Sequence, residues 1–125
     1  MLQVNAYADA EPLLRECLAI REKTQPDLWS TPHTKSKLGR ALLGQKKYTD
    51  AEPLLIAGYE GMRQREATIP PQEKPRLTEA LEYVIQLYEA TNKPEQAAKW
   101  RKQLEASKAA QRQPEKKNSM KEAVA

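Results

Sequence analysis

The side chains that could carry out chemistry are few in this sequence. Its 125 residues include one histidine, His33, and one cysteine, Cys17. A metal site needs several such ligands at set spacings, so neither residue has the companions that a site requires. Cys17 also lies in the apolar run LLRECLAI, which favours a small buried hydrophobe over a reactive thiol. We therefore expect neither a metal nor a cofactor.

The carboxylates do not form a catalytic pattern either. Glu79, Glu82 and Glu89 follow one another at helical spacing, which is typical of a solvated helix face. The serines have no neighbouring base or oxyanion motif, which a serine nucleophile needs. The sequence thus indicates a protein that is not an enzyme.

The positive charge is concentrated at one end of the chain. Of the net charge of +4, three charges lie in residues 107–125, so the body is close to neutral. A balanced body has no electrostatic footprint for nucleic acid, and we expect no nucleic-acid partner. The tail is polar, poor in large apolar residues and interrupted by Pro114, a composition that predicts disorder.

The hydropathy pattern does not indicate a membrane protein. No stretch of about 18 apolar residues occurs, so no membrane-spanning helix is predicted. The first residues, MLQVNAYADAEP, have neither the basic nor the apolar region of a signal peptide. A cytoplasmic location is the expectation.

The elements that would position a site follow from a repeat. The octets YADAEPLL and YTDAEPLL begin at Tyr7 and Tyr48, 41 residues apart, and differ at one position. Repetition at a fixed period is typical of stacked arrays in which each unit packs on its neighbours. Apolar residues recur at helical spacing and no period of two occurs, which predicts an all-α fold of about five helices. The expected helices cover about 9–23, 31–44, 49–66 and 75–91, with a last helix from about 94.

The expected helix starts depend on capping residues. Asp9 precedes the first helix, and Thr49 precedes another with Glu52 completing a capping box. Thr31, which is followed by a proline, predicts a further start. The proline of each octet would then fall in a first turn, where its missing N–H costs least.

These residues resemble the tetratricopeptide repeat, in its long kinesin-light-chain-like variety of about 42 residues. The family pattern places a Leu-Gly pair in the first helix of a unit and an alanine twelve residues after the glycine. A bulky apolar residue and then a small one follow. Leu38-Gly39, Ala51, Leu55 and Gly58 stand at those positions.

The resemblance implies an α-α superhelix, a tetratricopeptide-like solenoid of antiparallel helix pairs. Residues 1–106 would form the repeat domain and 107–125 its basic, disordered tail. A partial first repeat would occupy 1–24, a second 31–66 and a third 75–106.

Small residues matter in this pattern because they let the two helices of a pair approach closely. Gly39 and Ala51 have this role in the second repeat. In the third repeat Ile85 replaces the small residue and Arg101 replaces the bulky apolar one. We expect the neighbouring Trp100 to fill that space.

Three longer phrases are similar to the C-terminal repeats of bacterial serine/threonine kinases of the planctomycete type. They are AEPLLRECLAIREKTQPDLW, LGRALLGQKKYTDAEPLLIAGYEGM and EALEYVIQLYEATNKPEQAAKWRKQL. The resemblance implies a bacterial protein and, as an alternative function, a C-terminal regulatory fragment of a kinase-like multidomain protein. The sequence has no glycine-rich loop, His-Arg-Asp or Asp-Phe-Gly motif, so kinase catalysis is not implied.

The family's geometry implies a non-catalytic protein–protein interaction module or scaffold. Its concave face, lined by the first helix of each pair, would bind a peptide or a partner domain. A clamp that some members use for C-terminal carboxylates needs Lys and Asn where Ser36 and Arg40 stand, so that ligand is not implied. The inward-facing residues would be His33, Ser36, Arg40, Leu43, Glu79, Glu82, Gln86 and Glu89.

The first expected helix has an apolar stripe without a hairpin partner. By the family's spacing, only MLQVN would remain of the helix before it. The stripe is too wide for the next unit alone to cover, and exposed apolar surface marks interfaces. We therefore expect a longer array or self-association through this helix. The stripe comprises Leu13, Leu14, Cys17, Leu18 and Ile20.

Overall fold

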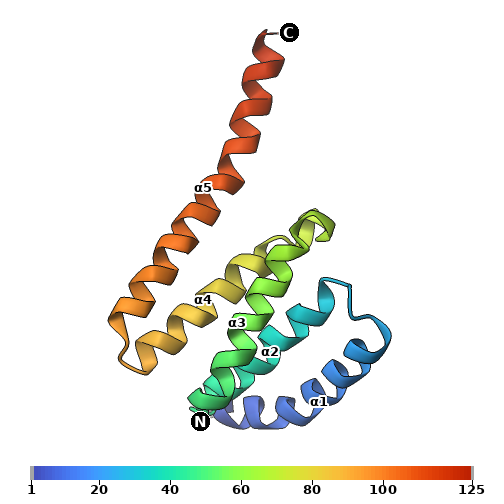
Figure 1. Ribbon diagram of the computed structural model, residues 1–125, viewed down its shortest axis with the longest axis vertical. Coiled ribbons are helices and arrows are strands. Elements are labelled where there is room, and N and C mark those ends of the chain that lie inside the picture. Colours follow the sequence, from blue (N-terminus) through green and yellow to red (C-terminus); the bar gives the residue numbers. More distant parts are fainter. Residues whose placement is uncertain (1, 125) are drawn as a thin grey trace.

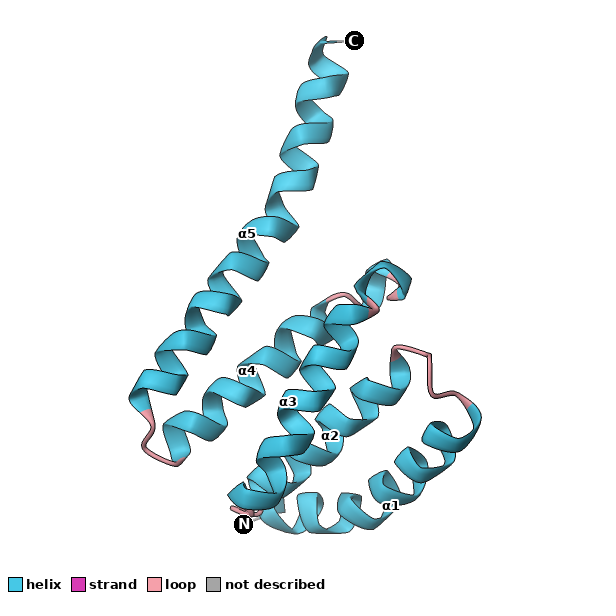
Figure 2. Cartoon of the chain, viewed as in Figure 1, coloured by secondary structure: helices cyan, strands magenta, loops and turns pink. Residues whose placement is uncertain are grey.

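The computed structural model describes the backbone of residues 2–124 and the side chains of residues 6–109. Five α-helices follow one another, with no strand in residues 2–124 (Figures 1 and 2). The predicted all-α fold is confirmed. The helices are α1 (Leu2–Thr24), α2 (Ser30–Gly44), α3 (Tyr48–Gln64), α4 (Pro75–Ala90) and α5 (Pro94–Val124), and two short 3-10 helices, Glu66–Thr68 and Pro71–Glu73, precede α4.

Helices that are neighbours in sequence are neighbours in space. α1 packs on α2, α2 on α3, α3 on α4 and α4 on α5, and α2 also touches α4 (Figure 1). Short turns at 45–47 and 91–93 fold α2–α3 and α4–α5 into antiparallel hairpins. This order of packing is that of a tetratricopeptide-like helical array, while its division into repeats stays a prediction.

Both hairpin turns use the same backbone device. Lys46 and Asn92 occupy corresponding places in the two turns and have positive φ angles of 64° and 58°. The amide of the residue after each one donates to a carbonyl five residues back, at N···O distances of 2.9 and 2.8 Å. A left-handed residue with this hydrogen bond is a common helix C-terminus, because it satisfies a carbonyl that the helix leaves free.

The backbones of α2 and α3 approach closely at two glycines. A Cβ atom at Gly39 would lie 2.7 Å from Leu55 Cγ. A Cβ atom at Gly58 would lie 2.7 Å from the backbone nitrogen of Ser36 and 2.9 Å from the carbonyl oxygen of Pro32. These contacts show why the crossing needs residues without side chains, as the Leu-Gly pattern predicted.

The α4–α5 hairpin has larger side chains at the positions that correspond to the close crossing of α2 and α3. Ile85 is buried at the position that corresponds to Gly39. Trp100 packs against the core and meets the ring of Tyr59 edge-on, with 5.8 Å between centroids. Arg101 points to the surface and pairs there with Glu89. Trp100 therefore faces the core and Arg101 the surface, while the filling of that space by Trp100 stays a prediction.

The start of α1 differs from the prediction. α1 begins at Leu2 rather than near residue 9, so Asp9 lies inside the helix and Pro12 lies well beyond the first turn. The segment before the octet is thus part of α1 and is not the end of a preceding helix. Packing explains the difference, because the Tyr7 ring lies against Gly44, where a Cβ atom would be 2.1 Å from Tyr7 Cδ2. Tertiary contact of this kind overrides a local capping signal.

Two other capping predictions are also wrong. α3 begins at Tyr48, so Thr49 lies inside it, and no side chain caps its first turn. Thr31 lies inside α2, and its hydroxyl donates to the carbonyl oxygen of Gln25 at 2.5 Å. Each helix begins one residue before the threonine that was predicted to precede it.

The backbone of the tail also differs from the prediction. α5 continues as helix to Val124 and extends past the other four helices (Figure 1). The segment 107–125, which the composition predicted to be disordered, is therefore helical as far as residue 124. Its content of Ala, Lys, Gln and Glu, which are good helix formers, accounts for this. That 107–125 lies outside the repeat domain stays a prediction.

Candidate functional site

A groove of about 670 Å³ lies between α1, α2 and α4, with the loop before α4 at its edge. Four of the eight residues that were predicted to face inward line it, namely His33, Ser36, Arg40 and Glu79. Ser36 is buried in its floor, because its backbone packs against Gly58. The groove is lined by Tyr7, Ala10, Leu14, His33, Ser36, Lys37, Arg40, Ala41, Glu73, Arg76, Glu79 and Tyr83.

The other four predicted residues are not part of the groove lining. Leu43 is partly buried against the core. Glu82 and Gln86 are exposed on α4, and Glu89 pairs with Arg101 of α5. Leu43, Gln86 and Glu89 stand in the last turns of their helices, beyond the residues that form the groove. Whether these four residues contact a partner stays a prediction.

Arg40 joins three helices at the centre of the groove. Its Nη2 donates to the Tyr7 hydroxyl of α1 at 2.9 Å, and its Nη1 donates to the Tyr83 hydroxyl of α4 at 3.0 Å. The guanidinium carbon also lies 5.5 Å from the ring centroid of Tyr7 and 4.8 Å from that of Tyr83. Both distances are within the range of cation–π attraction. Arg40 is therefore a structural link as well as a groove residue.

The α2 wall of the groove carries uncompensated positive charge. Burial raises the pKa of the Tyr83 hydroxyl, although the charge of Arg40 acts in the opposite direction. The hydroxyl therefore stays neutral, and Arg40 has no anionic partner among the described side chains. Lys37, one turn away and exposed, likewise has no ion pair there.

The opposite wall, formed by α4 and the loop before it, holds Arg76 between two carboxylates and has a net charge of −1. Arg76 Nε lies 3.1 Å from a carboxylate oxygen of Glu73, and its Nη1 lies 3.2 Å from Glu79. On the α2 wall, His33 stacks on Trp29 with 5.3 Å between ring centroids. Burial, helped by the charge of Lys37, lowers the pKa of His33 to about 4, so this imidazole is neutral near pH 7. The groove thus has an α2 wall with two cations that make no ion pair, and an opposite wall with a net charge of −1.

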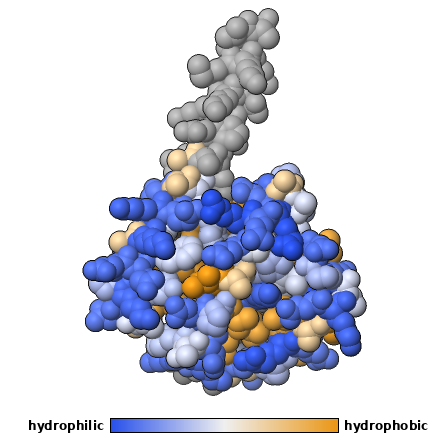
Figure 3. Space-filling view, viewed as in Figure 1, coloured by the Kyte–Doolittle hydropathy of each residue, from blue (hydrophilic) through white to orange (hydrophobic). Residues whose placement is uncertain are grey.

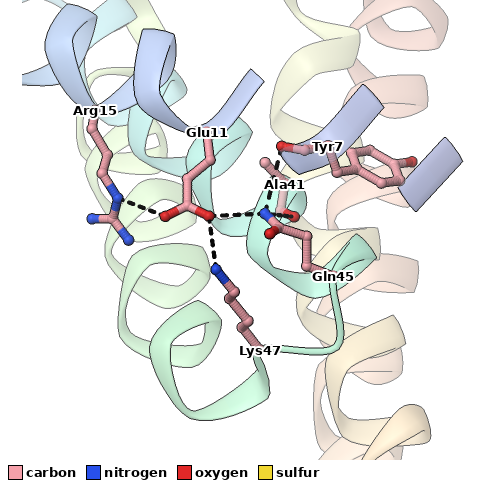
Figure 4. Close-up of polar contacts among 6 residues, drawn as sticks. All are labelled: Tyr7, Glu11, Arg15, Ala41, Gln45 and Lys47. Atoms are coloured by element: carbon pink, nitrogen blue, oxygen red, sulfur yellow. Dashed lines mark hydrogen bonds and ion pairs between the residues drawn. The ribbon is translucent and has the colours of Figure 1, made fainter. Parts of the chain in front are cut away.

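A polar cluster fixes α1 in place beside the groove (Figure 4). The carboxylate of Glu11 accepts hydrogen bonds from Gln45 at 2.9 Å, from Arg15 at 2.9 Å and from Lys47 at 3.2 Å. These bonds, with that of Gln45 first, lower the pKa of Glu11 to about 2. Because Gln45 and Lys47 belong to the turn after α2, the cluster holds the helix that supplies Tyr7 to the groove.

The glutamate of the second octet makes a matching link. Glu52 of α3 accepts a hydrogen bond from the Tyr88 hydroxyl of α4 at 2.9 Å. Burial, together with this bond, raises the pKa of Tyr88 to about 12. Each octet therefore supplies a carboxylate that ties its helix to a later part of the chain, Glu11 to the turn after α2 and Glu52 to α4.

Sequence reasoning missed five polar or aromatic residues of the groove. The signal available for Arg76 and Tyr83 on α4 was their spacing of three and four residues from Glu79, which places all three on one helix face. The contribution of α1 was not foreseeable, because it depends on where that helix begins. The five residues are Tyr7, Lys37, Glu73, Arg76 and Tyr83.

The described residues also show whether they contain a metal site or a membrane-spanning helix. They contain no group of three or more His, Cys, Asp or Glu side chains placed to hold a metal ion. None of the helices, over the part of the chain that is described, combines the length and apolar character needed to cross a membrane.

Comparison with known proteins identifies one segment. Residues 2–24, which are the whole of α1 and contain the first octet, match the family model of the tetratricopeptide repeat. No curated protein matches the chain. The tetratricopeptide repeat is a non-catalytic module that generally mediates protein–protein interaction. The match to α1 and the all-helical architecture together support a tetratricopeptide repeat protein.

Proposed function

We propose that this chain is a protein-binding module or scaffold that holds an acidic peptide segment in the groove between α1, α2 and α4. The uncompensated charge of Lys37 and Arg40 supports the acidic character of the ligand. A carboxylate brought to this wall would gain charge-assisted hydrogen bonds without displacing an existing ion pair. This uncompensated wall is the observation on which the proposal depends.

The tyrosines give the groove a second kind of contact. Tyr7 and Tyr83 flank Arg40 and contribute aromatic surface to the lining, beside the apolar side chain of Leu14. Tyrosine is enriched in binding surfaces because it combines apolar area with a hydroxyl and loses little conformational entropy. A peptide with an acidic residue next to an apolar or aromatic one would fit both features.

The test compares two peptides of equal length by isothermal titration calorimetry. One contains several Glu residues beside aromatic ones, and the other has each Glu replaced by Gln. We expect the Glu peptide to bind at least about fivefold more tightly, because each lost charge pair costs roughly 1 kcal/mol. Equal affinity of the two peptides would contradict the proposal.

Lys37 is the better residue to vary in this experiment. Arg40→Glu would remove the links to Tyr7 and Tyr83 and so would change the packing of α1 and α4 as well. Lys37→Glu changes the charge of the wall at an exposed side chain, and we expect it to abolish the preference for the Glu peptide. Lys99→Glu, exposed on α5 and outside the groove, is the matched control and should leave binding unchanged.

The alternative function is that of a C-terminal regulatory fragment of a serine/threonine kinase-like protein. It depends on the resemblance of three sequence phrases alone, as does a bacterial source. A cytoplasmic location likewise stays an expectation. The complete coding sequence around this chain would decide between the fragment and the free-standing module.

A further inference from the structure

The outer face of α1 forms a second groove, of about 420 Å³, that the proposed function does not use. Leu13 and Ile20 on this face are 69% and 56% exposed, which is unusual for large apolar side chains. Figure 3 shows apolar surface at the part of the view where α1 lies in Figure 1. The lining residues are Leu13, Glu16, Cys17, Ile20, Arg21, Thr24 and Gln25.

The repeated octet indicates what kind of element this face receives. With the two octets aligned, Cys17 and Ile20 of α1 correspond to Gly58 and Gly61 of α3. Both glycines face α2, since a Cβ atom on either would lie within 2.7 Å of atoms of Ser36 or Pro32. The same face of α3 is thus covered by an antiparallel helix, whereas on α1 it is open among the described residues.

The side chains on α1 are unsuited to a helix as close as α2 is to α3. Cys17 and Ile20 stand where that close approach needs glycine, so a helix here must lie farther away and interdigitate its side chains. A second α1 in antiparallel orientation meets this requirement. A twofold axis midway between the two residues places Cys17 of each copy against Ile20 of the other.

Charges on the face are complementary in the same register. Glu16 would lie opposite Arg21 of the second copy, and the symmetry repeats this pair. Glu16 is exposed and has no ion pair among the described side chains. Arg21 has neutral partners only, Cys17 Sγ at 3.2 Å, Ser30 Oγ at 3.0 Å and the Gln25 amide oxygen at 3.5 Å. Each unpaired charge therefore gains a partner in the dimer.

We propose that two copies of this chain associate through the outer faces of their α1 helices, packed antiparallel around Cys17 and Ile20. The test is sedimentation of the 125-residue chain at concentrations up to about 1 mM, which reaches even weak complexes. We expect a monomer–dimer equilibrium. A monomer throughout, or growth beyond the dimer, would overturn the proposal.

Variants locate the interface. Ile20→Glu should raise the dissociation constant at least about tenfold, because it buries a charge at the centre of the contact. Leu28→Glu is the matched control, since Leu28 is 48% exposed but lies outside the groove, and it should change the constant less than about twofold. A dimer that Ile20→Glu leaves intact would place the interface elsewhere. Circular dichroism of each variant checks that the helices are retained.

Cys17 gives an independent readout because it is the single cysteine of the chain. In the antiparallel register the two Cys17 residues are offset by about 4.5 Å along the helix axes, at the 1.5 Å rise per residue. A short bismaleimide should therefore cross-link the wild-type chain and the Leu28→Glu variant into a covalent dimer, and Ile20→Glu should not be cross-linked. Absence of the cross-link in a wild-type dimer would overturn the antiparallel arrangement.

Discussion

In the α2–α3 hairpin the two helices touch through glycines, whereas in the α4–α5 hairpin a buried isoleucine stands at the corresponding position. Gly39 and Gly58 leave no room for a Cβ atom, since each would bring one within 2.7 Å of the facing helix. Ile85 is 6% exposed, and Trp100 of α5 packs against the core, where it meets the Tyr59 ring. The first hairpin is therefore held by close backbone approach and the second by side-chain volume.

The turns of the two hairpins are alike in spite of this difference. Lys46 and Asn92 share a left-handed conformation and the same pattern of hydrogen bonds behind them. The turn thus reverses the chain in both hairpins, and the side chains at the crossing decide how far apart the helices lie. A small residue at the crossing is one solution within this fold and not a requirement of it.

The largest expected effect on stability is at Ile85 in the α4–α5 hairpin. Ile85→Ala should lower the free energy of unfolding by about 2–4 kcal/mol, because it leaves a cavity where volume holds the helices together. Urea unfolding followed by circular dichroism measures it. Glu82→Ala, exposed on the same helix, should change stability by less than about 0.5 kcal/mol. A small effect of Ile85→Ala would mean that α4 and α5 are not held by this side chain.

The α2–α3 hairpin should instead lose stability when side-chain volume is added at its glycines. Gly58→Ala is expected to lower the free energy of unfolding by about 1–3 kcal/mol, because the new methyl group meets backbone atoms of Ser36 and Pro32. Gly39→Ala should cost less, since Leu55 Cγ and Cδ2, its two closest contacts, belong to a side chain that can shift. Thermal melts of both variants give the order, and the reverse order would contradict backbone contact at Gly58.

Glu11, the glutamate of the first octet, makes the stability of the fold depend on pH. The pKa of Glu11 falls from 4.5 to about 2 on folding, so its charge stabilises the fold above about pH 4.5. That contribution is lost as the pH falls from 4.5 toward 2. Glu11→Gln should therefore lower stability by about 1 kcal/mol at pH 7 and by much less near pH 2.

Urea unfolding of Glu11→Gln and wild type at both pH values checks the prediction. The exposed Glu60→Gln is the control and should behave like wild type at either pH. If the difference between Glu11→Gln and wild type were the same at pH 7 and pH 2, the carboxylate would not be the source of the stabilisation.

The smallest expected effect lies in the turns. Lys46→Gly should raise the free energy of unfolding by about 0.5–1 kcal/mol, because glycine adopts a positive φ without strain. Asn92→Gly should gain less, since asparagine tolerates this conformation better than lysine. Denaturant midpoints of the two variants test the order. A loss of stability in Lys46→Gly would show that the lysine side chain matters more than the backbone angle.

The helices and their packing order were predictable from the sequence because apolar spacing and the repeated octet are local signals. The helix starts were not, since Thr31 and Thr49 were predicted to be caps although α2 and α3 each begin one residue earlier. Tyr7 shows the same limit, because its contact with Gly44 depends on tertiary structure. Local patterns therefore locate elements better than they locate element ends.

The candidate groove was predictable in part. His33, Arg40 and Glu79 follow from the face that the family pattern turns inward. Which charges remain unpaired was not predictable, because Arg76 pairs with Glu73 and Glu79 through contacts that depend on exact side-chain positions. The free charge of Lys37, and the use of Arg40 as a link between helices, became visible only in three dimensions.

The most direct measurement is an NMR titration of the isotopically labelled chain with the Glu-containing peptide. If the groove binds it, the amide shifts should concentrate in residues 33–41 of α2 and 76–83 of α4, around Lys37 and Tyr83. The same peptide should leave those amides nearly unmoved in the Lys37→Glu variant. Shifts confined to the basic segment 107–125, with α2 and α4 unchanged, would contradict binding in the groove.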